Sequence, residues 1–318
     1  MIPVLYYLVG LPASGKSTYA KELLSCSENI ILISSDEMRK ELYGDENNQN
    51  NNGELFQIIN KKVKENLKKG IDVIYDATNI NSKRRISFLN ELNKINCYKK
   101  CIYFSSTYDH CVYKDKHRTR TVGENVIKRM YYSLQIPMYF EGWDDIKIMP
   151  DDKIVSNMNN SIDFNINSYK EYEILFNNYR ELEYCLDLSQ DNPYHSLSVS
   201  RHMYYAYDWI KQYTDNKYLR IATMLHDIGK PETKAFKDRY AHFYGHENVS
   251  AQLCIHLLKT HDNLNDKEII KIATYIQLHM MLLNFKDNIK SKDIFYDKVG
   301  EGLNKDLELL HNADVQAK

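Results

Sequence analysis

Short apolar runs alternate with polar stretches of helical length along the first 150 residues of the chain. The runs are PVLYYLVG, NIILISS, GIDVIYDAT and CYKKCIYFSS, at residues 3–10, 29–35, 70–78 and 97–106. Runs of this length that end at turn residues predict buried strands, and the patterned polar stretches between them predict helices. This alternation predicts an α/β domain in which helices cover a parallel sheet.

The pattern changes in the second half of the chain. Between Met149 and Tyr169 it gives way to Asp, Asn and Ser residues, which is typical of a linker. Later segments, among them SVSRHMYYAYDWIKQY and KEIIKIATYIQLHMMLL, repeat apolar residues at helical spacing. We therefore predict an α/β domain at residues 1–150, a linker or crossing segment at 151–175, and an all-α domain at 176–318.

Length and composition fit a chain of two globular domains. The 318 residues exceed the size of one ordinary core, and 43% of them are hydrophobic and 27% charged. No apolar run approaches the length that spans a bilayer, so we expect no contact with a membrane. The six cysteines are scattered without the spacing of a disulfide framework, which favours reduced thiols and a cytoplasmic protein.

Charge is distributed unevenly between the two halves. Residues 1–150 carry 22 Lys and Arg against 18 Asp and Glu, a balance of +4. Residues 151–318 carry 20 against 25, a balance of −5, and the whole chain has a formal net charge of −1. We therefore expect an anionic substrate on the first half, where a nucleic acid would meet a local basic surface.

The stretch GLPASGKST matches the phosphate-binding loop G-x-x-x-x-G-K-[ST] and lies between a predicted strand and a predicted helix. Backbone N–H groups at the positive end of that helix would hold the phosphates of ATP or another NTP. We expect Lys16 to reach the transferring phosphate and Ser17 to hold Mg²⁺. The residues expected to bind the nucleotide are Gly10, Ala13, Ser14, Gly15, Lys16, Ser17 and Thr18.

The ends of the next two predicted strands carry the candidate acceptor groups. Asp36 follows the second strand, and Arg39 comes about one helical turn later. A carboxylate there can accept a proton from the acceptor hydroxyl while the arginine holds an acceptor phosphate. A helix N-cap is the alternative for Asp36. Asp76 ends the third strand, and the basic cluster KRR at 83–85 is either an acceptor track or a solvated face.

A third basic segment, DKHRTRTVGENVIKRM, contains Arg118 and Arg120. These arginines could close over the bound triphosphate as a lid and neutralise the charge that develops during transfer. The alternative is an arginine-rich surface helix without a catalytic role.

Taken in order, GLPASGKST, SSDEMRKELYGD, YDATNINSKRR, HRTRTVGENVIKRM and IPMYFEGWDDI resemble the P-loop kinase module of 5′-OH polynucleotide kinases over about residues 1–150. The resemblance implies that Asp36 is the general base and that Arg39 contacts the acceptor strand. It also implies that Arg118 and Arg120 are lid arginines. The loop motif alone is generic, whereas the ordered set is specific.

Histidines are concentrated in the second half, where nine of the eleven follow residue 190. His226 and Asp227 are adjacent near the end of an apolar helix, so they can approach a metal ion from two sides. Nitrogen and oxygen ligands of this kind suit Mn, Fe, Co, Ni or Zn. A single histidine is more often a structural residue than a ligand, but the set as a whole favours a metal site. The candidate ligands are His202, His226, Asp227, His246, His279 and Asp314.

The segments NPYHSLSVSRHMYYAYDW, MLHDIGKPET, HFYGHENVSA and HNADVQAK resemble the HD phosphohydrolase superfamily over about residues 180–318, with Met224 where that pattern has leucine. They look like the HD domain fused to bacterial tRNA nucleotidyltransferases. The resemblance implies one or two transition-metal ions, with Asp227 bridging to a second ion held by His246 and His279. It also implies that Lys230 stabilises phosphate charge.

A kinase and a phosphohydrolase in one chain would work against each other on a single group. Acting on different ends of one broken strand resolves the conflict, and the pairing resembles end-healing enzymes that join a polynucleotide kinase to an HD phosphoesterase. We therefore predict a nucleic-acid substrate, RNA in preference to DNA, with a 5′-OH end and a 2′,3′-cyclic or 2′/3′ phosphate end. We also predict a separate ligase as partner. The alternatives are a small-molecule or nucleoside kinase fused to an HD nucleotidase, and an RNA-binding sensor without catalysis.

Overall fold

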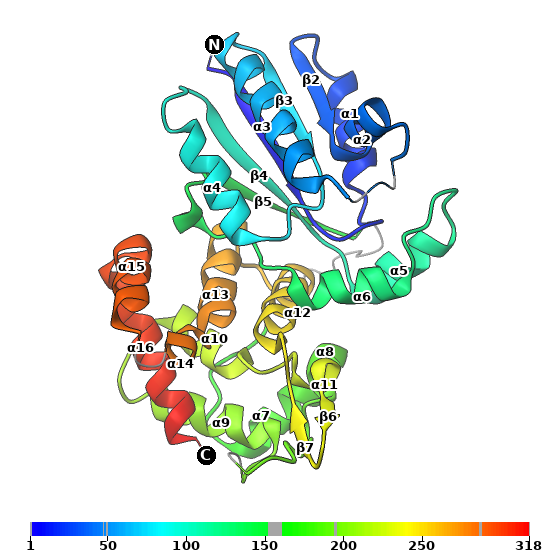
Figure 1. Ribbon diagram of the computed structural model, residues 1–318. Coiled ribbons are helices and arrows are strands. Elements are labelled where there is room, and N and C mark those ends of the chain that lie inside the picture. Colours follow the sequence, from blue (N-terminus) through cyan, green and yellow to red (C-terminus); the bar gives the residue numbers. More distant parts are fainter. Residues whose placement is uncertain are drawn as a thin grey trace. The chain divides into compact units, whose positions relative to one another are not determined.

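The computed structural model describes residues 2–46, 48, 50–151, 161–193, 196–285 and 288–317. Contacts within the chain divide it into two compact units (Figure 1). The first unit comprises Met1–Met130 and Pro137–Asp152, and the second comprises Tyr131–Ile136 and Lys153–Lys318.

A parallel five-stranded sheet forms the centre of the first unit, with the strand order β2-β3-β1-β4-β5. Four of its strands correspond to the predicted apolar runs. The fifth, which ends the sheet beside β4, has the sequence DIKIMP and was not predicted, because Asp and Lys interrupt its apolar positions. The strands are β1 (Val4–Val9), β2 (Ile30–Ser34), β3 (Asp72–Asp76), β4 (Tyr98–Ser105) and β5 (Asp145–Pro150).

Helices cover this sheet on both faces because successive strand residues point to opposite sides. Leu8 and Ile74 join the buried cluster that contains Ala20 of α1. The adjacent Tyr7 and Tyr75 point the other way, toward Phe88 of α4. The helices of this unit are α1 (Lys16–Ser25), α2 (Ser35–Tyr43), α3 (Asn52–Lys68), α4 (Ser82–Leu92), α5 (Tyr108–Lys116), the first part of α6 (Glu124–Ser133) and the short η1 (Tyr139–Glu141).

The second unit is helical, as the sequence predicts. Fully buried apolar residues line its core helices α9, α10, α12, α13 and α16. The helices are α7 (Tyr169–Asn177), α8 (Arg180–Glu183), α9 (Val199–Ile210), α10 (Lys217–Leu225), α11 (Lys230–Thr233), α12 (His246–His261), α13 (Asp266–Leu278), α14 (Met281–Phe285), α15 (Ile289–Val299) and α16 (Glu301–Gln316).

Two features of the second unit differ from the simple helical pattern. A small antiparallel hairpin, β6 (Ala235–Lys237) and β7 (Tyr240–His242), lies between α11 and α12 in the sequence. The residues 131–136 also belong to this unit, where polar side chains of α12 hold their backbone: Gln252 Nε2 donates to the Tyr131 carbonyl over 2.9 Å, and Asn248 Nδ2 donates to the Tyr132 carbonyl over 2.9 Å.

The predicted linker at 151–175 falls partly outside the described residues, which omit 152–160. Its last residues belong to α7, whose N-cap Ser168 accepts a hydrogen bond from the Glu171 N–H. The six cysteines are all free thiols. Within the described part of the chain, every helix is too short or too polar to cross a bilayer.

Candidate active sites

The phosphate loop of the first unit connects β1 to α1. Gly15 has a φ of 92°, a left-handed conformation that favours glycine, and α1 begins at the next residue. Among the described residues, no side chain caps this helix and no acidic residue lies in its first turn. Its N–H groups are therefore available to an anion.

Lys16 lies back along the loop. Its ammonium group donates to the carbonyls of Gly10, at 3.0 Å, and Leu11, and it lies 3.3 Å from the Ser14 hydroxyl. Burial lowers the pKa of Lys16, while the carboxylate of Asp76 opposes that shift. A buried ammonium held only by neutral carbonyls and a hydroxyl is suited to accept an anionic phosphate as a better partner.

Ser17 lies beside a carboxylate from another strand. Its hydroxyl donates to Asp76 Oδ2 over 2.8 Å. Burial raises the pKa of Asp76, and Lys16 and the Ser17 hydroxyl oppose that shift. A hydroxyl and a carboxylate at the phosphate loop form an oxygen-rich pair of the kind that Mg²⁺ prefers. The sequence places Asp76 at a strand end but indicates no role for it, because its partner Ser17 lies 59 residues away.

The candidate general base Asp36 lies in the first turn of α2, and Ser34 is the N-cap of that helix. The N-cap alternative for Asp36 is therefore wrong. Two arginines bind the Asp36 carboxylate: Arg39 Nη1 lies 2.9 Å from Oδ1, and Arg120 Nη1 lies 2.7 Å from Oδ2. Asp36 is half-exposed, so it remains open to a substrate.

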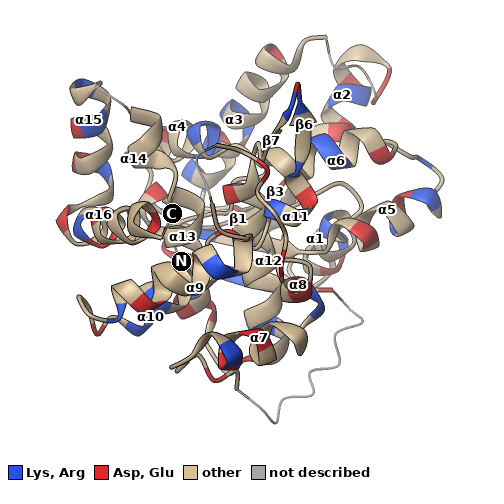
Figure 2. Cartoon of the chain, turned by 90° about the horizontal axis from the view of Figure 1, so that it is seen from below, with Lys and Arg blue, Asp and Glu red and all other residues tan. Residues whose placement is uncertain are grey.

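The two candidate lid arginines, Arg118 and Arg120, differ in their partners. Arg120 joins Asp36 and also lies 3.3 Å from Glu46 Oε1. Arg118 forms an ion pair with Asp115, whose carboxylate also accepts the N–H of Gly123 over 2.9 Å. Lys and Arg residues gather at the end of α5 and in the segment after it (Figure 2).

The basic cluster at 83–85 does not act as one surface. Arg84 is exposed, whereas Arg85 is fully buried and forms an ion pair with Glu141 at 2.6 Å. Glu141 also accepts hydrogen bonds from the Ser82 hydroxyl at 2.8 Å and from the Trp143 indole at 3.0 Å. Arg85 therefore has a structural role, and the interpretation of the whole cluster as an acceptor track is wrong.

Four imidazoles meet at the centre of the second unit, and all are held in the same way. In each ring Nδ1 lies 2.7–2.8 Å from a backbone carbonyl, which can only accept, so Nδ1 carries the proton and Nε2 offers a lone pair. The pairs are His202 with Ala317, His226 with Thr223, His246 with Phe243, and His279 with Ile276.

Asp227 lies between two pairs of these imidazoles. Its Oδ2 atom lies 3.5 Å from His202 Nε2 and 3.4 Å from His226 Nε2. Its Oδ1 atom lies 3.2 Å from His246 Nε2 and 3.7 Å from His279 Nε2. The centre therefore contains two adjacent donor sets that share one carboxylate.

Within each pair the two Nε2 atoms approach to 3.2 Å. When both rings are neutral and carry their protons on Nδ1, two lone pairs face each other, and a shared cation would relieve that repulsion. Burial and the neighbouring His246 lower the pKa of His279 to about 3, which keeps this ring neutral. The donors therefore fit one or two transition-metal ions.

Asp314 and Lys230 complete this centre. Asp314 Oδ1 lies 2.9 Å from His202 Nε2 and 3.4 Å from His226 Nε2. It therefore lies on the side of the donor set formed by His202, His226 and Asp227. Lys230 is buried, and its ammonium lies 2.6 Å from Asp227 Oδ2 and donates to Gln190 Oε1 over 2.7 Å. Burial raises the pKa of Asp227, but the ammonium of Lys230 opposes that shift and the pKa lies well below its usual value, so Asp227 stays ionised.

A close approach between α11 and α12 supports the centre. A Cβ atom on Gly229 would lie 2.6 Å from the Ser250 nitrogen and 2.7 Å from the His246 carbonyl oxygen, so only glycine fits there. Of two further histidines near the sequence motifs, His195 lies outside the described residues, and the His242 ring stacks on Tyr244.

Two family models match the chain. The model of the AAA domain matches residues 5–137, and that of the HD domain matches residues 194–314. The chain is thus a fusion of a P-loop kinase-like domain with an HD domain.

Single proteins resemble parts of the chain. An L-seryl-tRNA(Sec) kinase from Methanococcus maripaludis is 27% identical over 184 residues, which cover 54% of this chain and 69% of the relative. A structure of the Pnkp1/Rnl/Hen1 complex is 25% identical with a TM-score of 0.33, over 38% of this chain and 40% of that one. A structure of the Pnkp1/Rnl/Hen1 RNA repair complex is 20% identical with a TM-score of 0.36, over 41% and 43%. The match thus spans about two fifths of the length of either structure.

Proposed function

We propose that the chain heals the ends of broken nucleic acid, with RNA as the preferred substrate. The first unit phosphorylates a 5′-OH end with ATP or another NTP, and the second removes a 2′,3′-cyclic or 2′/3′ phosphate. The observation that carries this proposal is the presence, in separate compact units, of a phosphate loop with a carboxylate–arginine pair and of a paired histidine–aspartate centre. The two opposite reactions make sense together when they act on different ends, which a separate ligase could then join.

In the kinase unit, Asp36 accepts the proton of the attacking 5′-hydroxyl. Arg39, which now binds Asp36 Oδ1, orients that carboxylate and reaches the first phosphate of the acceptor strand. Lys16 moves from its loop carbonyls to the transferring phosphate, and Arg118 and Arg120 neutralise the charge that develops there. Ser17, beside Asp76, would hold Mg²⁺, which supplies further charge neutralisation when bound.

In the HD unit, His202, His226, Asp227 and Asp314 would hold one metal ion, and Asp227, His246 and His279 a second. When bound, such ions supply Lewis acidity and an acidified water. Lys230 keeps Asp227 ionised and places a positive charge where it can meet the substrate phosphate. The carbonyl contacts of the four Nδ1 atoms fix the rings, so the donor set is organised in advance.

The test uses purified protein, ATP, Mg²⁺ or Mn²⁺, and RNA with a 5′-OH end and a 3′-phosphate or 2′,3′-cyclic phosphate end. We expect both ends to change, as followed by labelled-end gel analysis. Lys16→Ala should abolish 5′ phosphorylation alone, and Asp227→Asn should abolish 3′ dephosphorylation alone. Nucleosides or nucleotides processed in preference to both RNA ends would favour the runner-up, a small-molecule kinase fused to a nucleotidase.

A further inference from the structure

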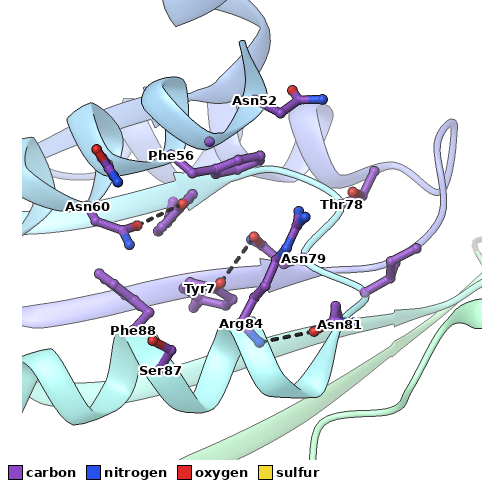
Figure 3. Close-up of a pocket in the computed structure, with 14 residues that line it drawn as sticks. Tyr7, Asn52, Phe56, Asn60, Thr78, Asn79, Asn81, Arg84, Ser87 and Phe88 are labelled. Atoms are coloured by element: carbon purple, nitrogen blue, oxygen red, sulfur yellow. Dashed lines mark hydrogen bonds between the residues drawn. The ribbon is translucent and has the colours of Figure 1, made fainter. Parts of the chain in front are cut away.

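A pocket of about 290 Å³ opens in the kinase unit (Figure 3). Its volume lies just below the usual range of ligand sites, roughly 300–1,000 Å³. It lies between α3 and α4, over the face of the sheet to which Tyr7 and Tyr75 point. Neither the nucleotide loop nor the Asp36–Arg39 pair contributes to its lining.

The lining combines aromatic rings with side-chain amides. Phe56 and Phe88 provide apolar ring surface, and Asn60 and Asn79 provide donors and acceptors (Figure 3). The amides are held in place, because Asn60 Oδ1 accepts the Tyr75 hydroxyl over 3.1 Å and Asn79 Nδ2 donates to the Leu8 carbonyl over 2.8 Å. The fourteen lining residues, all of them described, include no Asp or Glu.

The sole arginine of this lining is Arg84, whose guanidinium carbon lies 6.0 Å from the centre of the Phe56 ring. The helix periodicity explains the arrangement: Asn52, Phe56 and Asn60 recur every fourth residue on α3, and Arg84 and Phe88 are four apart on α4. Two helix faces therefore form a slot with flat walls and polar edges, which suits a planar heterocycle better than a phosphate or a sugar.

Hydrogen bonds connect the pocket to Asp36, the candidate general base. Asn52, at its rim, accepts a hydrogen bond from Arg39 Nη2 over 3.0 Å, and Arg39 Nη1 binds Asp36. Thr78 and Asn79, also in the lining, follow Asp76 closely in the chain. A group in the pocket would therefore be attached close to the hydroxyl that Asp36 activates.

We propose that this pocket binds the nucleobase of the first nucleotide of the 5′-OH strand. In this proposal the base stacks on the Phe56 ring, and the amides of Asn60 and Asn79 form hydrogen bonds with the edge of the base. Arg84 covers the open side of the pocket. This inference rests on the proposed kinase function and adds a subsite that selects nucleotide-bearing acceptors. A small metabolite as the true acceptor would be an outcome of the test.

The experiment compares two 5′-OH trinucleotides that differ only at the first residue, one with adenine and one abasic. Binding to the full-length protein is measured by calorimetry, and phosphorylation is measured as KM and kcat with ATP. We expect the abasic strand to bind with an affinity lower by on the order of tenfold, with a matching rise in KM. Phe56→Ala should weaken binding of the adenine strand to the same extent, so that the two strands bind with equal affinity.

The matched control is Tyr98→Ala, which removes a partly exposed aromatic ring at the start of β4, at the other end of the strands. It should preserve the difference between the strands. Equal affinity of wild type for both strands, or a difference that survives Phe56→Ala, would overturn the pocket assignment. The binding measurement needs no turnover, so it decides the pocket even where the kinase is inactive. Absence of phosphorylation on every strand would instead refute the proposed function.

Discussion

Arg84 and Arg85 are neighbours in the sequence with opposite environments. Arg85 and Glu141 are both fully buried, and Ser82 and Trp143 satisfy the remaining oxygen positions of Glu141. Removing one member of such a pair leaves an uncompensated buried charge, at a cost of about 3–5 kcal/mol. We therefore expect Arg85→Ala to lower the free energy of unfolding of the first unit by about that amount, and Arg84→Ala to change it by less than about 0.5 kcal/mol.

Urea unfolding followed by Trp143 fluorescence measures this difference. Trp209 is the second tryptophan of the chain and lies in the other unit, so a Trp209→Phe background isolates the signal. Equal effects of the two alanine variants would show that the buried pair adds no stability.

We expect the candidate metal centre to depend most on Asp227, because each of its oxygens faces a different imidazole pair. We expect Asp227→Asn to reduce the metal content of the protein at both positions, and His279→Ala to reduce it at one. Elemental analysis after dialysis measures the number of ions per chain. The control is Asp208→Asn, which replaces a half-exposed carboxylate paired with Lys211 and should retain the wild-type metal content. Wild-type content in Asp227→Asn would remove this residue from the ligand set.

The candidate site residues were easier to predict from the sequence than the residues that contact them. The loop motif selected Lys16 and Ser17, and the histidine pattern selected six side chains that the structure brings together. The partners of these side chains depend on tertiary contacts. The Ser17–Asp76 bond links two elements far apart in the chain, and which of Arg84 and Arg85 is buried depends on how α4 faces the sheet.

The same limit applies to whole elements. The strands β1 to β4 were predictable because each contains at least three consecutive apolar residues, as expected in a buried parallel sheet. The edge strand β5 mixes charged and apolar residues and is recognisable only from its pairing with β4. The residues 131–136 belong to the second unit through side chains of α12 that lie more than 100 residues away, which no local pattern could indicate.

The contact of α11 with α12 predicts an effect at the level of elements. Gly229→Ala would place a methyl group 2.6 Å from the Ser250 nitrogen, so α11 and α12 would have to separate. That shift displaces Asp227, two residues before Gly229, and His246, whose carbonyl borders the same site. We expect loss of metal content and at least a tenfold loss of phosphoesterase activity, with 5′-kinase activity unchanged.

The control is Gly302→Ala in α16, where a Cβ atom would have no neighbour within 4 Å. Alanine favours a helix over glycine by about 0.5–1 kcal/mol, so this variant should be neutral or slightly stabilising. Metal analysis and both activity assays are made on the two variants side by side. Full metal content in Gly229→Ala would show that the helices tolerate the methyl group.

At the scale of the whole molecule, each candidate site is built from one unit. Lys16, Ser17, Asp36 and Asp76 belong to the first unit, and every candidate metal ligand belongs to the second. The charge balance also differs between the two halves of the sequence, with +4 in residues 1–150 and −5 in residues 151–318. Sites that share no residue need not share a protein molecule, which predicts that the two end reactions are separable.

Mixing two variants, each expected to lack one of the two activities, tests that separation. Lys16→Ala removes the phosphate ligand of the kinase unit, and Asp227→Asn removes the carboxylate of the HD unit. We expect an equimolar mixture to convert both ends of an RNA with 5′-OH and 3′-phosphate ends. Each end should react at the same rate as with the variant that retains that activity, measured by itself. Time courses of both ends, analysed with labelled substrate, compare the mixture with wild type at the same concentration of each active site. A mixture that processes one end normally and the other more than tenfold more slowly would show that the strand passes between sites within a single chain.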